Sequence, residues 1–290
     1  MNLKERQKLY GELIEYLQKD YYARTTSSNT INQNGVTIGG CDFLGNQINL
    51  WSYWQGSLEA KILLVGQDWG TLNQDVPRNK KTKENVQKIA KGEEAGYFDG
   101  IEENDQFETD KNIKELFKGL GNKYTDLLQK NKDLFFTNLC LGYRSEGNSK
   151  GFRVKWLRDD VKYLSGFDIV EGTNTKHISG LLEIIKPDVV ICLGKKTYEV
   201  LIRQYSKELY ANKQTQKNIS GPEKTEFNLR LDNGNNYQDI LCDGKEIRVY
   251  AVAHPSPLGM ANRGRNEEKD GRILQHSDWC RIGKWLENKL

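Results

Sequence analysis

The sequence is poor in the residues that build metal sites and disulfide frameworks. Of its 290 residues, five are cysteine and three are histidine. The cysteine count is odd and no Cys-x-x-Cys pair occurs, so neither a zinc site nor a disulfide framework is indicated. His177 and His276 have no partner at metal-ligand spacing. We therefore predict no metal site.

Long apolar runs are also absent. No stretch approaches the roughly 20 residues that a membrane-spanning helix needs, and no signal-peptide pattern opens the chain. We therefore expect a soluble, cytoplasmic protein with no membrane partner. The net charge of +3 permits a nucleic-acid partner but does not require one.

Four short apolar runs are the main structural signal. They are separated by helical patterns, which predicts a parallel α/β sheet. The runs are Ile62–Val65, Leu134–Thr137, Val189–Leu193 and Val249–Ala253. We predict a three-layer α/β/α fold around a central four-stranded, mostly parallel sheet.

The remaining segments suggest helices and insertions around this sheet. The predicted helices are Leu3–Tyr22, Asn112–Leu128, Trp156–Leu164, Ile178–Ile185, 196–209 and Ile273–Leu290. Residues 1–58 form an N-terminal helix and an aromatic region, in which Leu50–Trp54 is either a lid over the sheet or a base-stacking platform. Residues 59–290 form the α/β domain, with insertions near 71–110 and 205–245.

One glycine-lysine sequence imitates a nucleotide-binding loop. Leu193–Thr197 resembles the end of a phosphate-binding loop, but the upstream glycine of that motif would fall at Val189, inside a strand. We therefore reject a nucleoside triphosphatase. Gly194 instead predicts a tight strand-to-helix turn, with Lys195 near a helix start where an anion can bind.

Each apolar run is followed by a distinctive polar or glycine-rich sequence. These are Gly66-Gln67-Asp68-Trp69-Gly70, Asn138, Gly194-Lys195-Lys196 and His254-Pro255-Ser256-Pro257-Leu258. Ligands of open α/β sheets bind outside the carboxyl ends of the strands. An acid, an amide and a histidine are thus predicted to meet in one crevice, which suits an enzyme.

These motifs resemble the uracil-DNA glycosylase superfamily. Its best-known family has Gly-Gln-Asp-Pro-Tyr after the first strand and His-Pro-Ser-Pro-Leu after the last, and here Gly66-Gln67-Asp68 and His254–Leu258 match them. Asn138 falls where that family keeps its base-reading asparagine, and Ile185–Gly194 is similar to the third-strand segment. The similarity covers scattered blocks from about residue 60 to 270.

The resemblance implies a DNA glycosylase, which flips a pyrimidine out of DNA and hydrolyses its N-glycosidic bond to leave an abasic site. Asp68 would stabilise the cationic sugar and orient or deprotonate a water, while His254 would donate a hydrogen bond to the departing base. The residues implied at the base are Gln67, Trp69, Gly70 and Asn138. The Asn138 amide can sit either way round, so it could read uracil or a cytosine-type edge. No cofactor is implied, because water is the nucleophile.

The same resemblance implies a set of contacts to duplex DNA, and we expect a monomer because one flipped nucleotide needs only one crevice. Leu258 matches the apolar wedge that fills the vacated stack. Ser256, Arg263 and Arg265 are expected to hold phosphates, with help from Lys195 and with Gly194 beside them. The iron–sulfur cysteine pattern of some superfamily members is absent.

One departure from the family pattern leaves the substrate open. Trp69-Gly70 replaces Pro-Tyr, and that tyrosine resembles a steric gate against substituents on pyrimidine carbon 5. Gly70 therefore hints at a bulky base such as glucosylated cytosine of phage DNA, although other uracil-removing families also have glycine there. The sequence is compatible with four functions. They are repair of uracil or a damaged pyrimidine, antiviral attack on modified DNA, non-catalytic DNA binding, and action on RNA or free nucleosides. The aromatic residue that stacks on the base is Tyr97, Phe98 or Phe107.

Overall fold

A five-stranded mixed sheet is the centre of the protein. The computed structural model describes residues 1–13, 36–37, 57–66, 108–121, 133–138, 143–144, 177–195, 197–198, 201–202, 230–265 and 270–289. The sheet order is β3-β2-β5-β7-β6. Its strands are β2 (Ile62–Gly66), β3 (Leu134–Asn138), β5 (Val189–Leu193), β6 (Tyr237–Cys242) and β7 (Lys245–Val252). All four predicted runs are strands, and they pair in parallel.

The prediction of four strands is wrong, because β6 adds a fifth. It pairs with β7 in antiparallel register and lies inside the segment predicted as the 205–245 insertion. As an edge strand it is polar and partly exposed, so it lacks the continuous apolar run of a buried strand. Asp243 (φ 46°) and Gly244 (φ 75°) join the two strands. An Asp-Gly pair with both φ angles positive is a strong hairpin signal, which the sequence prediction passed over.

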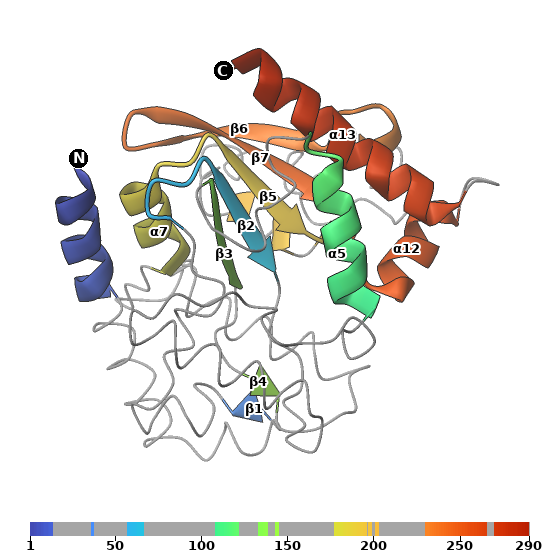
Figure 1. Cartoon of the computed structure of the whole chain (residues 1–290), viewed down its shortest axis with the longest axis horizontal. Helices are drawn as coiled ribbons and strands as arrows, with labels where there is room; N and C mark the ends of the chain where they lie inside the picture. The colour runs from blue at the N-terminus through green and yellow to red at the C-terminus, as the bar shows by residue number, and fades with distance from the viewer. Residues whose placement is uncertain are drawn as a thin grey trace, which may run out of the picture.

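Helices cover both faces of this sheet (Figure 1). α5 (Glu108–Lys118) and α13 (Gly271–Lys289) lie on one face, where Phe117 and Trp279 pack with Leu64 and Ile191. The opposite face carries the alternate residues of the strands. There α7 (His177–Ile185) and the helical residues 3–13 pack, and the Tyr10 ring stands edge-on to Phe135 at 5.8 Å between centroids. The described part of the chain is thus a three-layer α/β/α arrangement.

The helices begin and end close to several of the predictions. α7 and α13 agree with them to within two residues. α5 begins four residues earlier than predicted and ends at Lys118, after which Gly121 has a φ of 101°. A short helix that was not predicted, α12 (Pro257–Gly264), follows β7. Its start has a local cause, since Ser256 caps it and proline fits the first helical turn.

The N-terminal helical segment is fastened to the domain through Arg6. Its Nη1 donates to the carbonyl oxygens of Leu58 at 2.8 Å and Ile184 at 2.7 Å. The predicted helix Trp156–Leu164 and the aromatic cluster at Leu50–Trp54 lie outside the described residues. A separate two-stranded ladder pairs β1 (Val36–Thr37) with β4 (Tyr143–Arg144). Among the helices that the structure describes, none is both long and apolar enough to cross a membrane.

Candidate functional site at the carboxyl end of the sheet

The carboxyl ends of four parallel strands form one row. Gly66 pairs with Asn138, Val65 pairs with Cys192, and Leu193 pairs with Val252. The chain goes from β2 to β3 on one side and afterwards to β5 on the other side. The strand order therefore reverses at β2 and β5, and such a switch point is where open α/β sheets bind ligands.

The predicted site residues divide into those that the structure describes and those that it does not. Gln67, Asp68, Trp69 and Gly70 lie outside the described residues, as do the stacking candidates Tyr97, Phe98 and Phe107. The backbone of Asn138 ends β3 beside Gly66, the residue that ends β2. The row thus brings Asn138 next to the strand from which the Gln67–Gly70 segment continues.

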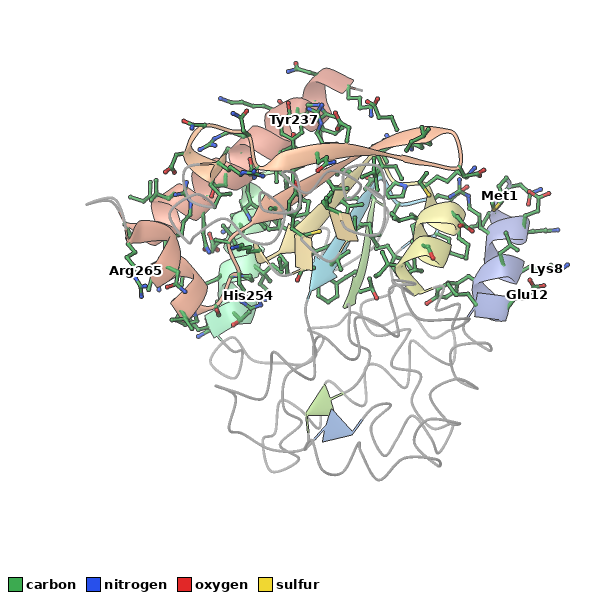
Figure 2. All side chains as sticks on the ribbon, turned by 180° about the vertical axis from the view of Figure 1, so that it is seen from behind. Met1, Lys8, Glu12, Tyr237, His254 and Arg265 are labelled. Atoms are coloured by element: carbon green, nitrogen blue, oxygen red, sulfur yellow. The ribbon has the colours of Figure 1, made fainter. Side chains whose placement is uncertain are left out.

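His254 lies two residues beyond the end of β7, at the same edge of the sheet (Figure 2). The backbone N–H of Ser256 donates to its Nδ1 at 3.1 Å. A nitrogen that accepts a hydrogen bond carries no proton, so the neutral imidazole holds its proton on Nε2. The half-buried ring of His254 is therefore set up as a hydrogen-bond donor through Nε2.

Gly194 makes the turn from β5 into the next helical segment. Its φ of 97° is in the left-handed region that favours glycine. Its N–H donates to Val252 O at 2.8 Å, and a Cβ built on it would lie 3.9 Å from the Cβ of His254. Helical backbone begins at Lys195, and Thr197 Oγ1 donates back to Leu193 O at 3.1 Å. The predicted turn is confirmed, and it brings β5 and β7 together beside His254.

The helix α12 presents the wedge candidate and carries one predicted cation at its end. Leu258 is 67% exposed in the first turn. The Ser256 hydroxyl accepts a hydrogen bond from the Gly259 N–H at 3.2 Å, so it caps the helix. Exposed Arg265 caps the other end, about 12 Å away at 1.5 Å per residue. Figure 2 shows His254 and Arg265 at opposite ends of α12.

The expectation that Arg263 holds a phosphate is wrong. Its side chain is completely buried and forms two hydrogen bonds to Asp278, with Nε 2.9 Å from Oδ2 and Nη2 3.1 Å from Oδ1. Nη2 is also 2.6 Å from Asp232 Oδ1. The spacing of Arg263 and Arg265 gave no sign that one points inward. Arg263 instead joins α12 to α13 and to the segment that leads into β6.

Two side chains that the sequence did not suggest hold the His254 turn. Gln275 Nε2 donates to the His254 carbonyl oxygen at 2.9 Å, and Asn112 Nδ2 donates to the Pro255 carbonyl oxygen at 2.9 Å. Both residues also line a pocket of about 330 Å³ between α5, α12 and α13. None of the predicted site residues lines that pocket.

Cys192, on β5 beneath the site, is completely buried. This burial raises the pKa of the Cys192 thiol far above its usual value. Within the described ranges no group of three His, Cys, Asp or Glu side chains is arranged to hold a metal ion.

A scan against models of known protein families finds no match to this chain, and a search of curated proteins finds none either.

Proposed function

We propose that this chain is a monofunctional DNA glycosylase with a uracil-DNA glycosylase-like fold. It binds duplex DNA as a monomer, takes one pyrimidine into the crevice at the carboxyl ends of β2, β5 and β7, and hydrolyses the N-glycosidic bond. The observation that carries the proposal is the hydrogen bond from the Ser256 N–H to His254 Nδ1 at this edge of the sheet. It supports a histidine that donates through Nε2.

The reaction needs two charges to be stabilised. When the bond between sugar carbon 1′ and the base nitrogen breaks, its electron pair leaves with the base, and the sugar becomes an oxocarbenium ion. A donor near a base carbonyl oxygen stabilises the anion, and a carboxylate near the sugar stabilises the cation. A water molecule then attacks carbon 1′ and leaves its hydroxyl group there. The proton that this water loses passes to the carboxylate and finally to the departed base anion.

We assign these roles to His254 and Asp68. His254 follows β7, and Asp68 follows β2, with β5 between these two strands. Neighbouring strands are about 4.8 Å apart, so the ends of β2 and β7 are separated by about 10 Å, which leaves space for a nucleoside between them. Exposed Leu258, at the start of α12 next to His254, is the side chain that enters the vacated stack.

The base itself is the open part of the proposal. Gly70 carries no side chain that could exclude a substituent on pyrimidine carbon 5, which favours a bulky modified cytosine, as in phage DNA, over uracil. Asn138, at the end of β3, is the residue that we propose reads the pyrimidine edge, together with Gln67 and Trp69. A role in antiviral defence follows if the bulky base is released, and a role in repair follows if uracil is.

Base release from defined DNA tests the proposal. Duplexes carry uracil, 5-hydroxymethylcytosine, its glucosylated form or no modification, and alkaline cleavage detects abasic sites. We expect release of one modified base, with a loss of about 10²–10³ in rate for His254→Ala, as for other preorganised donors, and a comparable or greater loss for Asp68→Asn. The control is His276→Ala, an exposed histidine on α13.

Two results would contradict the assignment. Full activity in Asp68→Asn or His254→Ala would place the chemistry elsewhere. DNA binding without release of any base would instead identify a non-catalytic DNA-binding module.

A further inference from the structure

The carbonyl groups of the His254 turn are held by helices that are distant in sequence. The two hydrogen bonds come from Gln275 on α13 and Asn112 on α5, and they end on the consecutive carbonyl oxygens of His254 and Pro255. Both helices lie on the same face of the sheet. The turn is therefore held from the helical layer, at the point where it leaves β7.

Contacts on its other side also limit the movement of this turn. The first turn of α12 packs against the His254 carbonyl group, and a Cβ on Gly259 would overlap that oxygen. The imidazole is held at Nδ1 by the Ser256 N–H, within the same turn. The orientation of the ring thus depends on the backbone from 254 to 256, and this backbone depends on Gln275 and Asn112.

Gln275 is poorly explained as a residue that only stabilises the fold. It is 1% exposed, and its Oε1 has no hydrogen-bond partner among the described residues. An unpaired buried carbonyl is unfavourable, and an apolar side chain of similar shape would avoid it. Within the described part of the chain, the hydrogen bond of this buried amide goes to the His254 backbone.

We propose that Gln275 and Asn112 are positioning residues for His254, an inference that rests on the proposed function. Gln275 holds the carbonyl group of His254 itself, and Asn112 holds that of the next residue. Together they set the place of Nε2 relative to the base, which matters most when charge develops in the transition state. Neither residue touches the substrate.

Replacement of Gln275 by methionine separates positioning from stability. Methionine keeps the length and volume but removes both the donor and the unpaired oxygen. We expect kcat for base release to fall by roughly 10- to 100-fold, the scale of a displacement of about 1 Å in a catalytic group. KM for the DNA should stay at the wild-type value. The urea midpoint should change little, because the substitution removes the unpaired Oε1 of Gln275 while it leaves the His254 carbonyl oxygen without this donor. The matched control is Gln238→Met, on β6 away from the turn.

A second measurement asks whether Gln275 acts through His254. In the His254→Ala background there is no imidazole to position, so Gln275→Met should cause no further loss of kcat. A loss of equal size in both backgrounds would overturn the inference, and so would wild-type kcat in the single variant. If Gln275→Met does not fold, Asn112→Ala is judged by the same two criteria.

The two proposals fail in different ways. If the wild-type protein releases no base from any of the four DNAs, the proposed function fails and the inference fails with it. If the wild-type protein is active and the Gln275 and Asn112 variants match it, only the inference fails.

Discussion

Replacing Arg263 by methionine should remove a large part of the stability of this protein. The Arg263 and Asp278 side chains are 0% and 1% exposed, and two hydrogen bonds join them. Without the guanidinium, the Asp278 carboxylate stays buried, and among the described residues the cation left beside it is Arg281, at 3.3 Å. Removing one partner of a buried ion pair costs about 3–5 kcal/mol. At about 2–4 °C per kcal/mol for a chain of this size, Tm should fall by roughly 6–20 °C.

Urea denaturation followed by circular dichroism measures the loss at pH 7. The control is Arg272→Met, which removes an exposed ion pair between α13 and Glu108 on α5 and should cost less than about 1 kcal/mol. The double variant Arg263→Met/Asp278→Leu should recover most of the loss, because an apolar pair leaves no buried charge. A loss in Arg263→Met no larger than in the control, or no recovery in the double variant, would refute this reasoning.

The loss of stability in Arg263→Met should depend on pH. Burial raises the pKa of Asp278, against the opposing effect of Arg263. A carboxyl group whose pKa is raised by folding contributes stability below its unfolded pKa of about 3.9, and this contribution is lost as the pH rises through the folded pKa. Removing Arg263 raises that folded pKa further. The difference in stability between Arg263→Met and wild type should therefore shrink as the pH falls from 7 to 4.

Three further predictions concern other parts of the molecule. Gly259→Ala should destabilise the protein by about 1–3 kcal/mol in urea denaturation, because the new Cβ overlaps the His254 carbonyl oxygen; an unchanged midpoint would contradict the close packing. Cys192 should resist iodoacetamide at pH 8 until urea unfolds the chain, since burial raises its pKa; labelling of the native protein, mapped by mass spectrometry, would be the opposite result. The hydrogen bond from Arg248 lowers the pKa of Asp239, so their ion pair contributes stability above an unfolded pKa of about 3.9 that is lost as the pH falls through the folded value. The free energy of unfolding of Asp239→Asn should accordingly fall less than that of wild type as the pH is lowered below about 4. An equal fall in both proteins would contradict a stabilising ion pair.

Local sequence was a good guide where burial on both faces leaves a continuous apolar run. Val189–Leu193 could be predicted as a strand for this reason, and every one of its residues is buried. The turn at Gly194 was predictable because a left-handed backbone favours glycine. The edge strand β6 was missed because an edge is half exposed and polar, although the Asp243-Gly244 pair gave a usable signal.

The four parallel strands, the helices α7 and α13, and the turn at Gly194 could be predicted from the amino-acid pattern, because each depends on periodicity or on a residue's own backbone preference. Which side chains contact the ends of the strands depends instead on how the folded chain packs. Arg263 and Arg265 look alike in the sequence, but one is buried against Asp278 and the other is exposed. Gln275 and Asn112 meet the His254 turn from two helices. Such contacts depend on how distant helices pack, and no spacing along the chain encodes them.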